Sequence, residues 1–263
     1  MTHRLELPHA VSRGPLVQFG RGTALLAMPG SGSVLVDANG VVAVDAPDQD
    51  QAEVLAVLGA PAAAASELLA GRFALRASSS CVGDRAVVVT AEAGGGKSAT
   101  AAALAARGHA VLCDAVTMIH GTPPAVAPRG DTTELWPDTA AALGLPVEDV
   151  PPLRAGITKR AYVLPREPSA STLGAVVALD LVNHGHGPAA HSLGGAQAVE
   201  VLTSLMWHRW AFADLGCRAA AFSWAVGVAR SVPVLRITSP RLPCDPAAVA
   251  AFIEELAARG WEQ

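Results

Sequence analysis

Eight residues from Ala91 to Ser98 have the types and spacing that bind phosphate. They read Ala-Glu-Ala-Gly-Gly-Gly-Lys-Ser, which fits the pattern GxxxxGK[ST] with alanine in place of the first glycine. Consecutive glycines let backbone N–H groups converge on phosphate oxygens, and a helix that starts at the lysine directs its positive end to the same place. Such a lysine reaches the β- and γ-phosphates of a nucleotide, and the serine hydroxyl ligates Mg²⁺. The residues expected to hold the phosphates and the metal are therefore Gly94, Gly95, Gly96, Lys97 and Ser98.

The surroundings of this motif favour a nucleotide site over a glycine-rich surface turn. Only two of the 19 basic side chains are lysines, Lys97 and Lys159, although arginine serves wherever a general positive charge is needed. Arginine and lysine differ where a site needs a compact charge on a flexible stem. The run 85–90 before the motif is apolar and β-branched, as in a buried strand. The run 97–107 after it is rich in alanine and ends at a glycine, as in a helix.

Two further strands are predicted to end in a carboxylate, at Asp114 and Asp180. The carboxyl ends of parallel strands face the ligand crevice of an open α/β sheet. Either aspartate could hold the metal of a nucleotide site, and the sequence does not choose between this role and a solvated strand end. Asp114 is the last residue of the predicted strand 109–114, which with 85–90 and 97–107 makes one βαβ unit.

The elements that position these residues fall into two regions. Asp37-Ala38-Asn39-Gly40 lies between valine-rich runs and predicts a hairpin in which Asn-Gly supplies the positive φ angles. We therefore expect a small β-rich subdomain over 1–70 and a nucleotide-binding α/β domain over 71–263. Further expected elements are helices at 51–58, 61–69, 138–143, 195–213, 218–229 and 245–259 and strands at 175–182 and 232–237.

Composition and charge argue against nucleic acid and membranes as partners of this chain. The chain has 263 residues, 51% hydrophobic content and a formal net charge of −4, which gives no overall attraction to nucleic acid or to an anionic membrane. The start lacks the basic and then apolar order of a signal peptide, and no stretch has the uninterrupted apolar length of a membrane span. We expect a cytoplasmic protein with no nucleic-acid and no membrane partner. The oligomeric state stays open, a homo-oligomer included.

Several segments resemble the HPr kinase/phosphorylase-like proteins, which are P-loop kinases related to phosphoenolpyruvate carboxykinase. The resemblance covers most of residues 50–260. It runs through the region 71–116, with the phosphate loop and the LCD strand, and continues through the segments TTELWPDTAAALGL, LRAGITKRAYVLP and VARSVPVLRITSPR. The front portion resembles the short amino-terminal region of the peptide-kinase branch, found beside genes for ribosomally made peptides such as lasso peptides. The resemblance implies an α/β fold of the HPr kinase type with a small β-rich N-terminal subdomain.

The same resemblance implies an activity and a set of site residues. Members of the peptide-kinase branch use ATP and Mg²⁺ to phosphorylate a hydroxyl, typically a serine of a precursor peptide. Asp114 matches the first aspartate of the family's Asp-Asp pair, one member of which acts on the attacking hydroxyl. Lys159 and Arg160 match a basic pair near the transferred phosphoryl group. The catalytic residues implied are Lys97, Asp114, Lys159 and Arg160, with Ser98 and Asp114 at the metal.

Three departures from the family pattern keep other functions open. Arg76 stands where the family usually has histidine, Ala115 replaces the second aspartate, and Ala99 replaces an acidic or hydroxyl residue. These changes bear on transfer to an acceptor more than on nucleotide binding. The leading hypothesis is an ATP-dependent kinase for a serine or threonine hydroxyl of a peptide or small protein. The alternatives are a nucleotide-binding scaffold that has lost catalysis and a kinase with a small-molecule acceptor.

Overall fold

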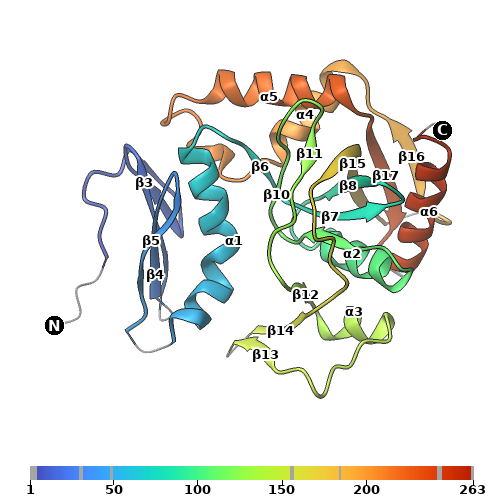
Figure 1. Ribbon diagram of the computed structural model, residues 1–263, viewed down its shortest axis with the longest axis horizontal. Helices are drawn as coiled ribbons and strands as arrows, with labels where there is room; N and C mark the ends of the chain where they lie inside the picture. The colour runs from blue at the N-terminus through green and yellow to red at the C-terminus, as the bar shows by residue number, and fades with distance from the viewer. Residues whose placement is uncertain are drawn as a thin grey trace. The chain divides into compact units, whose positions relative to one another are not determined.

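The chain folds as a mixed α/β protein. The computed structural model describes residues 5–29, 32–47, 50–154, 157–183, 185–241 and 245–261. The chain divides into two compact units, of which unit 1 comprises 1–74 and 206–224, and unit 2 comprises 75–205 and 225–263 (Figure 1). The boundary expected after residue 70 lies near the break after Ala74. The sequence gives no sign that 206–224 belongs to unit 1.

Unit 1 is built on an antiparallel sheet that has, among its described residues, five strands in the order β1-β2-β3-β4-β5. Helix α1 (Gln51–Leu69) lies against β3, β4 and β5 (Figure 1). Side chains alternate between the two faces of a strand, so Leu26, Val34 and Val36 are fully buried on the helix side. The strands are β1 (Ser12–Arg13), β2 (Val17–Phe19), β3 (Thr23–Met28), β4 (Gly32–Asp37) and β5 (Gly40–Asp45).

The predicted hairpin joins β4 and β5, but its turn closes differently. The Oδ1 atom of Asp37 accepts hydrogen bonds from the backbone N–H groups of Asn39 (2.7 Å) and Gly40 (3.2 Å). Gly40 has a φ of 134°, whereas Asn39 does not enter the positive region. The aspartate therefore closes a turn that Asn-Gly was expected to close alone.

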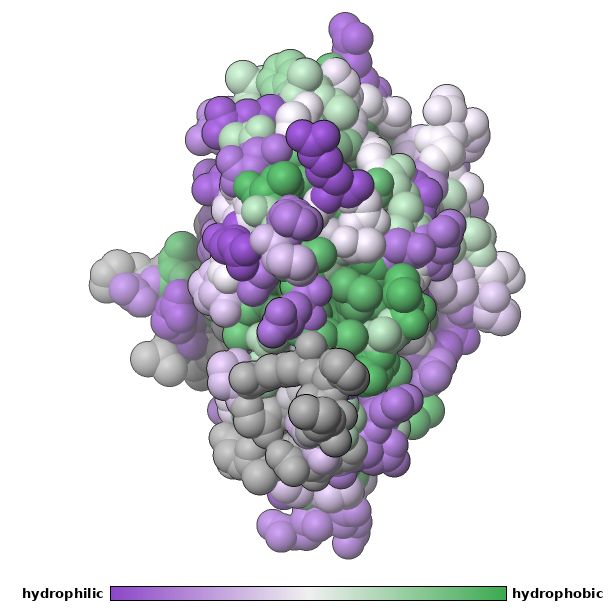
Figure 2. Space-filling model, turned by 90° about the vertical axis from the view of Figure 1, so that its left-hand side faces the viewer, coloured by the Kyte–Doolittle hydropathy of each residue, from purple (hydrophilic) through white to green (hydrophobic). Residues whose placement is uncertain are grey.

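The edge strand β5 carries exposed apolar side chains. Val41 and Val42 are 51% and 55% exposed. Figure 2 shows one face of the molecule, on which apolar side chains gather between polar ones.

One continuous helix replaces the two short helices expected at 51–58 and 61–69. Helix α1 continues through Pro61, which lacks the N–H for an intrahelical bond. Its buried residues, among them Val54, Leu58 and Ala65, lie on both sides of the proline, so packing on the sheet holds the helix together. By length and composition alone, α1 is also apolar enough to cross a membrane, a test that core helices of soluble proteins pass as well.

Unit 2 is built on a mixed central sheet, in which parallel and antiparallel strand pairs both occur. Across its described residues the strand order is β16-β17-β15-β8-β7-β9, with β11 also paired to β15. Strands β8 and β17 run parallel to β15, whereas β7 runs antiparallel to both β8 and β9. The strands are β7 (Ala77–Val82), β8 (Arg85–Thr90), β9 (Val111–Cys113), β11 (Ala125–Val126), β15 (Ser171–Val182), β16 (Ala189–Ser192) and β17 (Val234–Pro240), with the short strands β6 (Ala74–Leu75) and β10 (Thr117–Met118) beside them.

The expected βαβ unit forms in a split version. Helix α2 (Lys97–Ala106) connects β8 to β9, and these two strands point the same way, but β7 lies between them in the sheet. Three consecutive serines of β7, Ser78, Ser79 and Ser80, are thereby placed between two strands of the sheet and are 1% exposed. The carboxyl ends of β8 and β9 still meet at one edge.

Helices cover both faces of the central sheet. Helices α2 and α6 (Pro246–Ala258) pack together with Val89, Val177 and Ile237 on one face (Figure 1), whereas α4 (Gly195–Ser204) packs on Ala178 of the other face. A small sheet in the order β12-β14-β13 and helix α3 (Pro137–Ala142) cover the far side of α2. Its strands are β12 (Thr133–Leu135), β13 (Pro152–Arg154) and β14 (Ile157–Tyr162).

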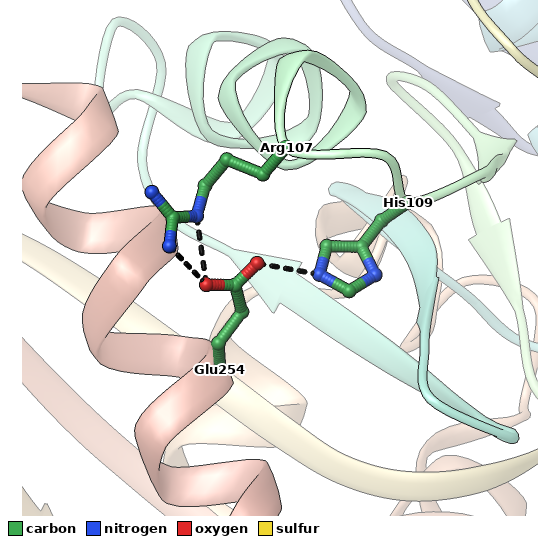
Figure 3. Close-up of polar contacts among 3 residues, drawn as sticks. All are labelled: Arg107, His109 and Glu254. Atoms are coloured by element: carbon green, nitrogen blue, oxygen red, sulfur yellow. Dashed lines mark hydrogen bonds and ion pairs between the residues drawn. The ribbon is translucent and has the colours of Figure 1, made fainter.

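An ion-pair cluster joins the end of α2 to α6. Arg107, at the end of α2, donates from Nε to Oε2 of Glu254 at 2.7 Å and from Nη2 to the same oxygen. The ring of His109 lies 2.7 Å from Oε1 of Glu254 (Figure 3). Glu254 lies on α6, and hydrogen bonding to Arg107 lowers its pKa.

The prediction of one long helix over 195–213 is wrong. Helix α4 ends at Ser204, and a separate 3₁₀ turn (η1) follows at Arg209–Ala211. The carbonyl oxygen of Leu205 accepts the backbone N–H of Arg76 at 3.0 Å, which draws the chain out of the helix. Helix α5 (Arg218–Ser231) then starts where the sequence predicts it, and Asp245 caps α6 by accepting from Ala248 N.

Candidate functional site

The glycine-rich loop lies between β8 and α2, as the sequence predicts. Gly94 and Gly96 have φ angles of 75° and 87°, which side chains of L residues rarely adopt. A Cβ on Gly95 would lie 2.7 Å from the Cβ of Ala91, so a larger residue does not fit there. Gly96 is the N-cap of α2 and offers no side chain to the first helical N–H groups. The backbone N–H of Gly95 donates to the carbonyl oxygen of Glu92 at 3.0 Å, and the loop leads directly into the positive end of α2.

Lys97 folds back over this loop. Its Nζ atom donates to the carbonyl oxygens of Ala91 (3.0 Å) and Glu92 (2.9 Å). Burial lowers the pKa of the Lys97 ammonium, the carboxylate of Asp114 opposes this shift, and the positive charge of Arg76 adds to it. The ammonium is thus a partly desolvated cation that rests on two neutral acceptors.

Asp114 follows β9 and is the centre of a polar cluster. Its Oδ1 atom accepts hydrogen bonds from the hydroxyls of Ser78 (2.5 Å) and Ser98 (2.8 Å). Its Oδ2 atom accepts the backbone N–H of Glu134 at 3.1 Å. The structure therefore brings together Ser98 and Asp114, the two residues expected at the metal, and adds Ser78 and Glu134, which the motif does not include.

Glu134 brings a second carboxylate beside this cluster. It lies on β12, and its Oε2 atom is 3.6 Å from Nζ of Lys159 on the neighbouring strand β14. Burial raises the pKa of Glu134, Lys159 opposes the shift, and Asp114 adds to it. The Lys159 ammonium also lies 5.6 Å from the centre of the Trp136 ring. A single glutamate in a polar stretch gives no sequence signal for this position.

The structure separates the two basic residues expected to act as a pair. Neighbouring residues of a strand point to opposite faces, and Lys159 points to Glu134 while Arg160 points elsewhere. Nε of Arg160 donates to the carbonyl oxygen of Val147 at 2.7 Å, and Nη1 donates to that of Thr158 at 3.3 Å. Arg160 therefore holds the loop after α3, and neither of these hydrogen bonds joins it to Asp114.

Arg166 is a basic residue that sequence reasoning missed. Backbone hydrogen bonds to Val111 hold its segment beside β9. Its Nη2 atom donates to Oγ1 of Thr133 at 3.2 Å, whereas Nε and Nη1 are buried and, within the described part of the chain, have no hydrogen-bond partner. Burial lowers the pKa of Arg166, and Asp114 opposes the shift. A buried guanidinium with two open donors favours a nearby anion.

Asp180, the other predicted strand-end carboxylate, and Ala115, a departure from the family pattern, both differ from Asp114. Asp180 lies inside β15, which pairs in parallel with β17 as far as Val182, and its side chain is 54% exposed and lies 3.2 Å from Nε of Arg236. Ala115, where the family has a second aspartate, adopts a φ of 66°. An alanine in the left-handed region is strained, and its side chain has no group that could accept a proton.

The cluster fits a nucleotide with Mg²⁺. Magnesium prefers oxygen ligands and is usually held by one or two protein groups together with substrate phosphates. Ser98 and Asp114 supply a hydroxyl and a carboxylate 2.8 Å apart at the start of α2. Lys97, Lys159 and Arg166 surround them with positive charge, in a chain whose net charge is negative. Anionic phosphates are therefore attracted locally, although the whole chain does not attract them.

Comparison with known proteins gives a match among solved structures. No protein-family model matches the chain, and no curated protein matches it. Among solved structures, the chain is similar to the HPr(Ser) kinase/phosphatase from Coxiella burnetii. The TM-score is 0.37 and the sequence identity 14%, and the match covers 71% of this chain and 94% of that one. Similarity of this degree assigns no activity to the residues of the site.

Proposed function

We propose that the protein is an ATP- and Mg²⁺-dependent phosphotransferase that phosphorylates a serine or threonine hydroxyl of a peptide or small protein. The observation that carries this proposal is the meeting of Lys97, Ser98 and Asp114 at one edge of the sheet. A glycine-rich loop, a lysine, a hydroxyl and a strand-end carboxylate are the parts that P-loop enzymes use to hold a nucleotide triphosphate. Two segments far apart in sequence supply them here.

The residues around the loop divide the work of holding the phosphates. The amides of the loop and the first turn of α2 bind phosphate oxygens. Lys97 exchanges its contacts with the Ala91 and Glu92 carbonyls for the phosphates, since an ammonium favours an anion over neutral acceptors. Ser98 and Asp114 hold Mg²⁺, which neutralises charge on the phosphate oxygens when it is bound.

Two carboxylates stand near the expected position of the acceptor, and their surroundings differ. Asp114 already accepts three hydrogen bonds and so has few lone pairs left. Glu134 has a raised pKa, and its Oε2 atom lies 3.6 Å from the ammonium of Lys159. A base with a pKa moved toward neutrality suits proton transfer. We therefore assign Glu134 to the acceptor hydroxyl and Asp114 to the metal.

In the transfer step, the γ-phosphoryl group moves from ATP to the acceptor hydroxyl. The acceptor oxygen forms a bond to the γ-phosphorus, while the bond from that phosphorus to the β–γ bridging oxygen breaks and ADP leaves. The hydroxyl proton passes to Glu134. Lys159 and Arg166 offset the negative charge that spreads over the transferred phosphoryl oxygens. The peptide class of the acceptor rests on the resemblance of the N-terminal region to the short amino-terminal region of the peptide-kinase branch.

Intact-mass analysis tests this proposal directly. The protein is incubated with ATP, Mg²⁺ and candidate acceptor peptides, proteins or small hydroxyl compounds, beside the Lys97→Met variant. We expect one acceptor to gain a phosphoryl group with the wild type and not with the variant. Failure of every acceptor, combined with no ATP binding in calorimetry, would contradict the proposal.

A specific observation also supports a second candidate, a nucleotide-binding scaffold without transfer. Ala115 offers no carboxylate beside Asp114, and Arg76 stands where a histidine is usual. This function gives a different result in the same experiment. ATP and Mg²⁺ would raise the melting temperature of the wild type, and no acceptor would change in mass. Loss of transfer in Glu134→Gln distinguishes the kinase, because a scaffold has no transfer to lose.

A further inference from the structure

Ser78 is a buried side chain whose hydroxyl lies behind the proposed metal site. It belongs to β7, is 1% exposed, and donates to Oδ1 of Asp114 at 2.5 Å. Strands β8 and β9 flank β7 on its two sides, and Ser78 is paired in register with Val89 of β8. A shift of the Ser78 backbone would therefore break the pairing of β7 with β8.

The three donors to Asp114 are not equivalent. Ser98 also donates to Oδ1, but it lies in the first turn of α2, where its hydroxyl is expected to bind Mg²⁺. The backbone N–H of Glu134 donates to the other oxygen, Oδ2. When Ser98 gives up its hydrogen bond for the metal, Ser78 is the donor that stays on Oδ1.

We propose that Ser78 is a positioning residue for the metal site, because it keeps the Asp114 carboxylate oriented while Ser98 changes partner. This inference rests on the proposed function. A carboxylate oxygen has two lone pairs; Ser78 occupies one, and the other points toward Ser98 and is free for the metal once the serine turns. Groups that hold a metal ligand by hydrogen bonding fix its direction and tune its affinity for the metal. Without Ser78, Asp114 can rotate about its side-chain bonds away from the start of α2.

The same strand provides a matched control. Ser79 is the next residue of β7, is also 1% exposed, and points to the opposite face of the strand. Its hydroxyl accepts from Oγ1 of Thr117 at 3.3 Å and does not contact Asp114. Ser78→Ala and Ser79→Ala therefore remove the same atom at the same depth, and differ in whether that atom holds the carboxylate.

The experiment measures metal binding separately from turnover. Mn²⁺ replaces Mg²⁺ as the probe, and electron paramagnetic resonance gives its Kd in the presence of a non-hydrolysable ATP analogue. Calorimetry in chelator gives the affinity for the metal-free analogue. We expect Ser78→Ala to weaken Mn²⁺ binding by roughly 10- to 100-fold, as for other residues that orient a metal ligand. Metal-free analogue binding stays at the wild-type value, and Ser79→Ala matches the wild type in both measurements.

Other results of these two measurements would overturn either the role of Ser78 or the proposed function. Equal Mn²⁺ affinity in folded Ser78→Ala and Ser79→Ala would overturn the role of Ser78. A wild type that binds the analogue but no Mn²⁺ would overturn it as well. A wild type that binds no analogue would instead contradict the proposed function. If Ser78→Ala has no melting transition, Ser78→Cys replaces it, since a thiol is a weaker donor of similar shape; a Mn²⁺ affinity equal to that of the wild type would then overturn the inference.

Discussion

Replacing Lys97 with methionine tests the phosphate site most directly. Methionine is unbranched and apolar, so the variant keeps much of the volume of the side chain and removes its charge. In the nucleotide-free protein the ammonium rests on the carbonyl oxygens of Ala91 and Glu92. In the proposed complex it lies instead against the phosphates. The substitution therefore removes an interaction that the transition state needs and the resting protein does not.

The size of the effect follows from charge and distance. A unit charge about 4 Å from a phosphate oxygen gains about 4 kcal/mol at an effective dielectric constant of 20. Giving up the two carbonyl contacts costs about 1 kcal/mol in net terms. The remainder of about 3 kcal/mol corresponds to a loss of about 10²-fold in kcat/KM. This agrees with the roughly 10²- to 10³-fold loss expected when one charge-stabilising donor is removed.

Stability should change in the opposite direction. Burial and the positive charge of Arg76 both lower the pKa of Lys97, so the folded state disfavours the charged ammonium. We expect Lys97→Met to melt at the same temperature as the wild type or higher. Lys97→Arg is the control for charge, and it should stay impaired because guanidinium cannot replace a compact ammonium at this site.

The assay is steady-state phosphorylation of the acceptor found by intact mass, with melting temperatures measured on the same samples. A loss of kcat/KM smaller than about tenfold, which is 1.4 kcal/mol, would refute the assignment of Lys97 to the phosphates. A melting temperature well below the wild type would show instead that the two carbonyl contacts hold the loop.

Three further substitutions have defined outcomes. Glu134→Gln should lower kcat by roughly 10²- to 10⁴-fold, which is the range for loss of a general base. Wild-type activity should rise with pH as this carboxyl, whose pKa is raised, loses its proton, and the variant should lack that rise. An unchanged kcat would assign the base to another residue. Gly96→Ala places a side chain on a residue with a φ of 87° and within 3.3 Å of Leu179. Urea unfolding should therefore show that the free energy of unfolding falls by about 1–2 kcal/mol. A free energy of unfolding equal to that of the wild type would show that the loop relaxes. Glu254→Gln should lower the melting temperature at neutral pH, because the folded-state pKa of Glu254 is held below its unfolded value by Arg107. That contribution is present above the unfolded pKa and disappears as pH falls through the folded one, so the two proteins should converge in acid; a constant difference would contradict the ion pair.

Much of the fold could be predicted because its signals are local. The apolar run of β8, the three glycines and the alanine-rich start of α2 follow one another directly, and each element forms where its composition favours it. Asp245 before Pro246 likewise specifies the start of α6, since capping involves residues three apart.

Predictions failed where packing overrides local preference. Pro61 normally interrupts a helix, but burial of α1 on the sheet continues it. The helix expected to reach residue 213 ends at Ser204, because a contact between Leu205 and Arg76 competes with it. Such a contact joins residues far apart in sequence, and the residue types of the two partners do not predict it.

The sequence by itself determined the phosphate motif, since Gly94 to Ser98 are contiguous and their chemistry depends on backbone shape and one helix end. Only the tertiary structure decided which carboxylate joins it. Asp114 meets Ser98 and Ser78 across 16 and 36 residues of chain, while Asp180 turns to Arg236. It also placed Lys159 with the site and directed Arg160 to a loop. These choices depend on strand order and on which face a side chain takes, and both are fixed by burial of the whole sheet rather than by neighbours in sequence.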